Sequence, residues 1–416
     1  MTSLTAANIA FAQTYPGESG RRQPVHVVYG GGHLFKAETC VKLGEIARRA
    51  FAEYAPTPKA LSEAVPMPAH LAETVHARVA EKLGREAVED YRVDFEDGYG
   101  VRADEVEDAD CDRAAREMAN GMAGGTLSPF CGVRIKALSE ESAPRGFRTL
   151  ERFLTELLRY SGGELPANFA VTLPKITVPE QVSALIEALE KFPGVNVELM
   201  METPQMLMRL PEFVDAARGR CVGVHFGPYD YTSSIGITAA QQSLLHPACD
   251  FARSMMQVML AGRGLALSDG PTTLLPIAPH RGAPLSAAQQ HENSAVVHRA
   301  WKLHYENIRH DLYRGFYQGW DLHPAQLPAR YAALYAFFLE GVNAAADRLK
   351  NFIASAAQAT RIGDVFDDAA TGQGLLNYFL RAVSCGAIPE ADIPALTGLT
   401  IAQLRSGSFG EILKGA

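Results

Sequence analysis

Short apolar runs recur along most of the chain, and each closes on polar residues before a segment with helical spacing begins. Segments between them, such as 179–192, place their apolar side chains on one face of a helix. We interpret eight runs as β-strands: 26–29, 91–95, 132–135, 169–173, 195–201, 221–226, 265–267 and, more weakly, 319–322. Strand followed by helix, repeated, predicts parallel strands joined by helical crossovers.

Residues 25–328 hold all eight units, and their length fits a closed (β/α)8 barrel, the TIM-barrel fold, whose usual size is ~250 residues before insertions. An open, doubly wound sheet is the alternative. The barrel is favoured because side chains capable of chemistry lie at or just past the C-terminal ends of different strands, and a barrel collects those ends in one mouth. These residues are Glu96, Asp97, Arg134, Lys175, Glu202, Asp230, Asp269 and His323.

Three segments do not follow this alternation. Residues 1–24 form an N-terminal extension, and Ala103–Gly125, with seven acidic residues, is predicted to be a solvated helix and loop that lengthens the second unit. Residues 329–416 are predicted to be mainly helical, with one apolar stripe that must be buried. The stripe consists of Leu334, Phe338, Val342, Ala345, Leu349 and Phe352. We expect this C-terminal region to pack on the barrel, to form a lid over its mouth or to join subunits, which favours a homo-oligomer.

The net charge of -8 argues against a general nucleic-acid binder, so an anionic substrate would need locally placed cations. The six cysteines lack a CxxC pair, which favours reduced structural thiols in a cytoplasm over disulfides or a zinc site. Residues 1–22 lack a signal-peptide pattern, and no run approaches the ~18 apolar residues of a membrane span. We therefore predict a cytoplasmic protein without a membrane partner.

Glu202 and Asp230 follow two successive predicted strands. A carboxylate just past a buried strand loses hydration unless a positive charge meets it, and hard oxygen ligands are those that Mg²⁺ or Mn²⁺ prefers. Gly227 and Pro228 form a fixed turn that can direct Asp230 inward. The alternatives are a solvated strand end for Glu202 and a helix cap for Asp230.

Asp94, Glu96 and Asp97 form a carboxylate cluster at the end of the second predicted strand. Three acids this close repel one another unless a cation or a shared proton is present or the side chains diverge. An ordinary loop turn is the alternative. Arg134, inside the third strand, needs a carboxylate or a bound anion, and its planar fork suits a small organic acid. A structural ion pair with Asp94 or Glu96 is the other interpretation of Arg134.

Lys175 and His323 complete the candidate residues. Lys175 follows the fourth strand, where its amine could contact a substrate or form a Schiff base, and the metal pair disfavours the Schiff base. His323 follows the last strand, where it either fixes the mouth or only forms a turn.

Six short motifs in strand order resemble the HpcH/HpaI aldolase and citrate lyase beta subunit family, within the phosphoenolpyruvate/pyruvate barrel superfamily, over about residues 25–330. They are Val93-Asp94-Phe95-Glu96-Asp97, Val133-Arg134-Ile135, Leu173-Pro174-Lys175, Met201-Glu202-Thr203, Phe226-Gly227-Pro228-Tyr229-Asp230-Tyr231 and Leu322-His323-Pro324-Ala325-Gln326. The resemblance implies that Glu202 and Asp230 bind Mg²⁺ or a similar ion and that Arg134 contacts the substrate carboxylate and enolate. Asp97 stands where the pyruvate aldolases place a histidine, which favours the citrate lyase and malyl-CoA lyase branch.

The motifs and the resemblance together imply a divalent-metal-dependent carbon–carbon lyase or aldolase, with Mg²⁺ or Mn²⁺ as cofactor, acting through a metal-stabilised enolate on a 2-oxo acid or hydroxyacyl substrate. Whether that substrate is a coenzyme A thioester stays open. The expected catalytic residues are Arg134, Asp97, Asp94 and Glu96, and the expected substrate contacts are Arg134, Lys175, Gly227, Pro228 and His323. One alternative is a Claisen condensation with glyoxylate, since Gly227 to Ser234 and the acidic run also resemble malate synthase. The other is a barrel that binds metal and 2-oxo acid without turnover.

Overall fold

The computed structural model describes residues 3–17, 20–282, 284–355, 360–362, 365–367, 369–406 and 412. Eight parallel strands form a closed barrel in sequence order, and the last strand pairs with the first. They are β1 (His26–Gly31), β2 (Asp90–Asp94), β3 (Phe130–Arg134), β4 (Phe169–Leu173), β5 (Asn196–Met201), β6 (Cys221–Phe226), β7 (Ala266–Pro271) and β8 (Gln318–Trp320). The predicted barrel is confirmed, and each strand coincides with or overlaps its predicted run.

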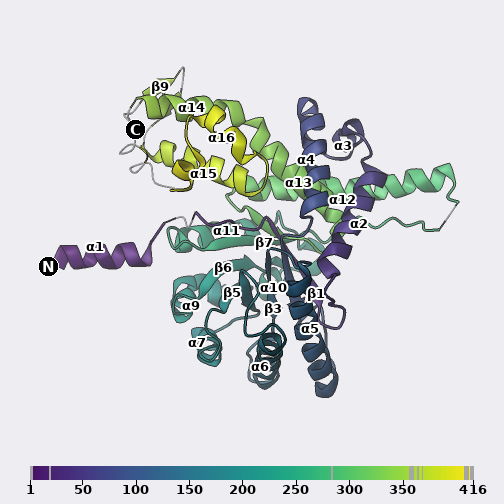
Figure 1. Ribbon diagram of the computed structural model, residues 1–416, viewed down its shortest axis with the longest axis vertical. Helices are drawn as coiled ribbons and strands as arrows, with labels where there is room; N and C mark the ends of the chain where they lie inside the picture. The colour runs from purple at the N-terminus through teal and green to yellow at the C-terminus, as the bar shows by residue number, and fades with distance from the viewer. Residues whose placement is uncertain are drawn as a thin grey trace.

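Helices surround this barrel, and Figure 1 shows them outside the strands. The strands read as continuous apolar runs because both faces are covered, so that every residue of β2 and β4 is buried. The helices between strands are α2 (Thr39–Tyr54), α3 (Pro58–Ala64), α4 (Ala72–Arg85), α5 (Asp104–Gly124), α6 (Ala143–Tyr160), α7 (Pro179–Ala188), α8 (Pro204–Met208), α9 (Leu210–Ala216), α10 (Pro228–Ser234), α11 (Pro247–Leu260) and α12 (Ala287–Tyr313). Short 3-10 helices are η1 (Ala69–Leu71), η2 (Ala239–Gln241), η3 (Pro324–Gln326) and η4 (Glu390–Asp392).

The acidic segment after β2 differs from its prediction. Residues 104–124 form one regular helix, α5, which is the crossover between β2 and β3 rather than an added solvated unit. Its apolar side, including Cys111 and Met118, is buried. Four of its acids (Asp104, Glu107, Asp108 and Asp112) instead form ion pairs with arginines of α6, such as Asp108 with Arg145 at 2.6 Å. The acidic composition therefore reflects pairing between two helices of the barrel layer.

The helical region after β8 begins with a helix of the barrel layer. Helix α13 (Leu327–Glu340) packs against α12, α4 and α2, and it is buried on nearly every side. Helix α14 (Val342–Ala354) follows, and the predicted stripe from Leu334 to Phe352 is buried except at the half-buried Val342. The later elements are β9 (Thr360–Ile362), β10 (Val365–Asp367), α15 (Ala369–Ser384), α16 (Ile393–Thr397) and α17 (Ile401–Arg405). Figure 1 shows α14, α15 and α16 grouped to one side of the barrel helices.

The N-terminal helix α1 (Ser3–Thr14) contrasts with these packed elements. It has no buried residue, and it projects away from the rest of the chain in Figure 1. Among the helices that the structure describes, none combines the length and the apolar character that a membrane crossing requires. All six cysteines are buried and form no disulfide, in agreement with the predicted structural thiols.

Candidate functional site

Glu202 and Asp230 come from the C-terminal ends of β5 and β6. Glu202 is 3% exposed, and its Oε2 atom accepts a hydrogen bond from the Lys175 backbone N–H at 2.6 Å. Burial raises the pKa of Glu202 to about 8, and the nearby charge of Asp230 adds to that rise. Asp230 lies in the first turn of α10 and is exposed. The two carboxylates are thus close enough to repel each other, and a cation between them would relieve that repulsion.

The Gly227-Pro228 turn packs beside Glu202 and leads into the helix that carries Asp230. The Gly227 N–H donates to the Met201 carbonyl at 3.0 Å, which places Gly227 beside Glu202. A Cβ atom at Gly227 would lie 2.3 Å from Glu202 Cγ, so only glycine fits here. Pro228 opens α10, and the backbone of Gly270 at the end of β7 packs directly against its ring. Both turn residues therefore position Glu202 and Asp230.

Arg134 and Asp94 form a buried ion pair inside the mouth. They are register partners at the ends of β3 and β2, and Arg134 Nε and Nη2 donate to the two Asp94 oxygens at 2.7 and 2.5 Å. Asp94 also accepts hydrogen bonds from the backbone N–H groups of Glu96 and Gly98. The ion pair that the sequence left open is therefore formed. Asp94 uses both oxygens to orient a guanidinium that is itself only 1% exposed.

Two aromatic residues that the sequence analysis did not select flank this guanidinium. Its central carbon lies 4.7 Å from the Tyr29 ring centroid and 5.4 Å from that of Trp320, within cation–π range. The Arg134 Nη1 atom is 3.4 Å from Glu96 Oε2. Tyr29 and Trp320 lie in the first and last strands, so only barrel closure brings them together, although both are polar aromatics within predicted strands.

Lys175 joins the acidic cluster to Glu202. Its Nζ atom lies 2.5 Å from Glu96 Oε1 and 2.8 Å from Asp97 Oδ2. Burial alone would lower the pKa of Lys175, but hydrogen bonds to Asp97 and Glu96 raise it well above its usual value. A protonated amine cannot form a Schiff base, so this environment disfavours that role. Lys175 serves as a fixed cation among carboxylates.

Glu96 and Asp97 differ in acidity although they are adjacent. Burial raises the pKa of Glu96 despite the opposing charge of Arg134. Burial also acts on Asp97, but the hydrogen bonds from Lys175 and from Glu96 outweigh it and lower the pKa of Asp97. Of the two carboxylates, Glu96 is therefore the better proton acceptor.

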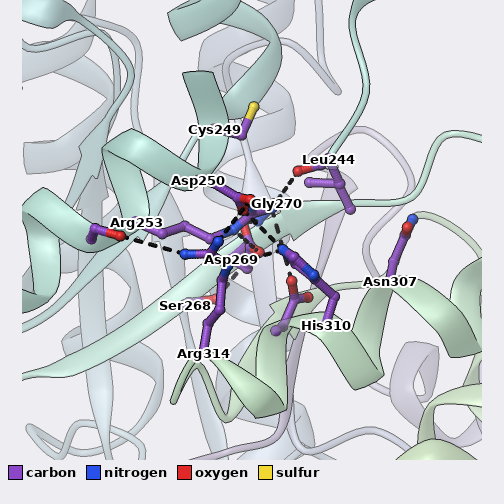
Figure 2. Close-up of polar contacts among 12 residues, drawn as sticks. Leu244, Cys249, Asp250, Arg253, Ser268, Asp269, Gly270, Asn307, His310 and Arg314 are labelled. Carbon is purple, nitrogen blue, oxygen red and sulfur yellow. Dashed lines mark hydrogen bonds and ion pairs between the residues drawn. The ribbon is translucent and has the colours of Figure 1, made fainter. Parts of the chain in front are cut away.

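Two other strand-end residues have their partners elsewhere. His323 caps the 3-10 helix η3, where its Nδ1 atom accepts from the Ala325 N–H at 3.1 Å, and its predicted contact with a substrate stays a prediction. Asp269 is buried, and its Oδ2 atom accepts from Arg253 Nε of α11 at 2.6 Å. Figure 2 shows Asp269 among side chains of α11 and α12, which include Asp250 and His310. Its carboxylate therefore lies toward the helical layer and not beside Glu202.

The donor set at the mouth fits a hard divalent cation that keeps part of its hydration. Among the described residues, no group of three or more His, Cys, Asp or Glu side chains could hold a metal ion. Glu202 and Asp230 would supply two carboxylates, and Mg²⁺ commonly binds proteins through one or two carboxylates plus water and substrate oxygens. Two close carboxylates, one of them buried with a raised pKa, suit this kind of site.

The fold and the mouth define a class, a (β/α)8 barrel protein with a carboxylate-rich polar site at the C-terminal ends of its strands. Within it, the chain belongs to the family described as a domain of unknown function, DUF6986, whose model matches residues 4–412. No curated protein matches the sequence.

Solved structures with the same fold include citrate lyase proteins. A citrate lyase from Burkholderia xenovorans LB400 is 19% identical, with a TM-score of 0.58 over 91% of this chain and 97% of that one. The protein CitE from Mycobacterium tuberculosis, solved in complex with magnesium, acetoacetate and coenzyme A, is 16% identical, with a TM-score of 0.51 over 87% and 99%. At these identities the likeness concerns the fold.

Proposed function

We propose that the protein is a divalent-metal-dependent carbon–carbon lyase that acts on a 2-oxo acid or a hydroxyacyl substrate through an enolate. The observation that carries the proposal is the pair formed by buried Glu202 and nearby Asp230. It lies at the mouth where TIM-barrel enzymes hold their active sites, close enough to Lys175 and Arg134 for their charges to lower the pKa of Glu202. Carboxylates for a metal beside fixed cations for an organic acid are what this chemistry requires.

Glu202 and Asp230 would hold the metal ion. When bound, Mg²⁺ or Mn²⁺ would act as a Lewis acid on the carbonyl and carboxylate oxygens of a 2-oxo acid. The Lys175 N–H fixes one Glu202 oxygen, and Gly227 leaves room for the glutamate side chain. These contacts hold the Glu202 carboxylate in place before any ligand arrives, which favours tight and selective binding.

Arg134 would supply positive charge to the substrate. Asp94 occupies its Nε and Nη2 atoms, which leaves Nη1 as the atom directed toward Glu96 and the mouth. A preorganised donor of this kind stabilises negative charge that develops on an enolate oxygen without moving during the reaction. Asp94 is accordingly a positioning residue, while Arg134 is the expected substrate contact.

Glu96 is the residue best suited to move a proton in this site. Its raised pKa makes Glu96 a better proton acceptor than Asp97, and Lys175 and Arg134 flank its two oxygens. Asp97, with a lowered pKa, would instead hold the Lys175 ammonium in place. Of the predicted acids, we therefore assign proton transfer to Glu96 or to a water molecule that it orients.

The fold likeness to citrate lyase proteins supports the same chemistry. The CitE structure from Mycobacterium tuberculosis contains magnesium, acetoacetate and coenzyme A, which are a divalent cation, an oxo acid and an acyl carrier. We extend the cation and the oxo acid to this chain because its own strand ends carry two carboxylates, Glu202 and Asp230, and an arginine, Arg134. Use of coenzyme A is part of the proposal to be tested.

The test is a substrate screen with purified protein and Mg²⁺, measuring release of pyruvate, oxaloacetate or glyoxylate with and without coenzyme A thioesters. Glu202→Gln and Asp230→Asn should each lower kcat/KM by about 10²-fold or more and abolish Mg²⁺ binding. Glu212→Gln, an exposed carboxylate of α9, is the matched control and should leave both unchanged. Full activity after EDTA treatment, or unaltered Mg²⁺ binding in both variants, would refute the proposal. Binding of Mg²⁺ and a 2-oxo acid without any cleavage would favour a non-catalytic barrel.

A further inference from the structure

Helix α1 exposes apolar side chains without the charges that usually accompany them. Ser3–Thr14 contains no acidic or basic residue, and no residue of this helix is buried in the described chain. Leu4, Ala7 and Phe11 recur at the spacing of one helical face, and Leu4 and Phe11 are 67% and 64% exposed. An isolated helix of about 12 residues is marginal in water, and α1 has no charged side-chain pairs to support it. Such a helix requires a surface to pack on.

Helix α11 has an exposed face of the same character. The exposed residues of this helix are all uncharged: Pro247, Phe251, Ser254 and Val258. Phe251 and Val258 are 52% and 76% exposed, and the half-buried Met255 lies between them on the same face. The barrel helix α7, in contrast, exposes Glu180 and Glu187, as a surface helix normally does. An exposed apolar face of this kind is typical of a contact site.

The base of α1 is fixed at the end of α11. The Gly17 N–H donates to the Gly262 carbonyl at 2.8 Å, and the Tyr15 side chain lies beside Gly262. The Arg263 guanidinium lies 5.5 Å from the centre of the Tyr15 ring. Only Tyr15 and Pro16 separate the helix from this anchor, and the proline restricts the backbone. Figure 1 shows α1 directed away from the barrel, where it can reach a neighbouring molecule but not its own α11.

We propose that two copies of the chain exchange their N-terminal helices, so that α1 of each copy packs on the exposed face of α11 in the other. The lengths agree, since at 1.5 Å per residue α1 is about 18 Å long and α11 about 21 Å. A twofold contact uses the same surfaces of both copies. Stable interfaces bury ~800 Å² per partner, and each copy contributes two helix faces toward that area.

The lack of charge on both faces supports a second copy over other occupants. A helix that binds a membrane surface normally has Lys or Arg on its polar face, and α1 has neither. A charged partner would find no complementary charge on the exposed face of α11. The C-terminal stripe, which led us to expect a homo-oligomer, is largely buried within the chain itself. The exchange of α1 gives that homo-oligomer a different interface.

Sedimentation velocity of the full chain tests the proposal, and we expect the wild type to be a dimer at micromolar concentration. Phe11→Asp and Val258→Asp each place a charge in the contact, so each should raise the dissociation constant about tenfold or more. Phe11→Asp changes only α1, which has no buried residue, so the barrel stays folded. Circular dichroism and Tm establish that Val258→Asp is folded. Thr155→Asp, at an exposed position of α6, is the matched control and should remain a dimer.

Cross-linking identifies the surfaces that meet. Ala7→Cys and Ser254→Cys each introduce an exposed thiol, whereas all six native cysteines are buried. After subunit exchange between these two variants, a flexible bis-maleimide should join α1 of one chain to α11 of the other, as mass spectrometry of the linked peptides would show. Ala7→Cys mixed with Thr155→Cys is the control and should give no such product.

Four results would overturn the proposal. One is a wild type that is monomeric at micromolar concentration. Another is a dimer that is equally stable in Phe11→Asp and Val258→Asp, which would place the contact on another surface. The third is a double variant, Ala7→Cys with Ser254→Cys, that is linked only within one chain, because α1 would then cover its own α11. The fourth is a monomer that binds anionic phospholipid vesicles through α1, which would assign the helix to a membrane surface.

Discussion

The charged residues at the two ends of the barrel differ in how far they are paired. At the mouth, Asp94, Glu96, Asp97, Glu202 and Asp230 accompany two cations, Arg134 and Lys175. At the opposite end, which we call the floor, Arg22 and Arg92 pair with Glu86, Glu89, Asp90 and Glu198. The mouth therefore has carboxylates that a bound cation can balance, whereas the arginines of the floor already have their counter-charges.

The two ends also share a construction principle. An inward-facing arginine is held by carboxylates at each: Arg134 by Asp94 at the mouth, and Arg92 by Asp90 and Glu198 toward the floor. The difference is what lies next to the pair. At the mouth a buried carboxylate, Glu202, stands close by with its pKa raised, while at the floor the two carboxylates Asp90 and Glu198 share one arginine. The comparison predicts separable roles for the two arginines.

Replacing Arg92 with methionine should have the largest effect, on stability. The change leaves the fully buried Asp90 without the arginine that pairs with it, and loss of one member of a buried ion pair typically costs ~3–5 kcal/mol. Urea unfolding followed by circular dichroism measures this, with Arg159→Gln as the surface control. If Arg92→Met unfolds at the wild-type urea concentration, the floor network is not a structural element.

Replacing Arg134 with lysine should mainly affect catalysis. Lysine keeps the charge but cannot contact Asp94 with two N–H groups while directing a third toward the mouth, so we expect kcat to fall about 10²-fold. The measurement is steady-state kinetics on the substrate that the screen identifies. Arg148→Gln, on the exposed side of α6, is the control. An unchanged kcat would show that the Arg134–Asp94 pair has only a structural role, like the Arg92–Asp90 pair at the floor.

Replacing Gly227 with alanine should weaken the metal site without changing any carboxylate. The added Cβ would lie 2.3 Å from Glu202 Cγ, so the glutamate must move, and we expect about tenfold weaker Mg²⁺ binding. Calorimetry with Mg²⁺ measures this affinity. Gly84→Ala in α4 is a matched control because no atom lies within 4 Å of the new Cβ. Equal Mg²⁺ affinity in the two variants would contradict the placement of the metal beside Glu202.

The smallest effect concerns acid sensitivity at the edge of the floor, where Glu86 contacts Arg22 and Lys82. Burial alone would raise the pKa of Glu86, but Arg22 and Lys82 lower it to about 2, against ~4.3 in an unfolded chain. Its stabilising contribution is therefore complete above pH ~4.3 and is lost as pH falls toward 2.

Glu86→Gln should accordingly lower the free energy of unfolding at pH 7 by roughly 1 kcal/mol, after allowance for solvent screening. It should also flatten the acid side of the stability profile between about pH 5 and 2. Unfolding curves across this pH range, compared with those of Glu63→Gln, an exposed glutamate of α3, measure the difference. Parallel profiles for wild type and Glu86→Gln would show that this ion pair has no net effect.

Local pattern was enough to predict most of the fold. Each strand of a parallel barrel is buried on both faces, so it appears as a short apolar run that needs no long-range information to be recognised. The same reasoning predicted that the acidic segment of α5 is a solvated addition to the barrel, which is wrong. Its charges face the arginines of α6, and composition alone does not separate an acid that faces solvent from one that faces a neighbouring helix.

The sequence by itself determined the strand order, the position of the mouth and the Glu202–Asp230 pair, because strand ends in a parallel barrel must meet at one face. Tertiary structure decided the rest. Strand register pairs Asp94 with Arg134, barrel closure brings Tyr29 and Trp320 to the same guanidinium, and α15 covers the floor. These contacts join residues far apart along the chain. Their geometry depends on register, closure and helix packing, which no local pattern of apolar and polar residues specifies.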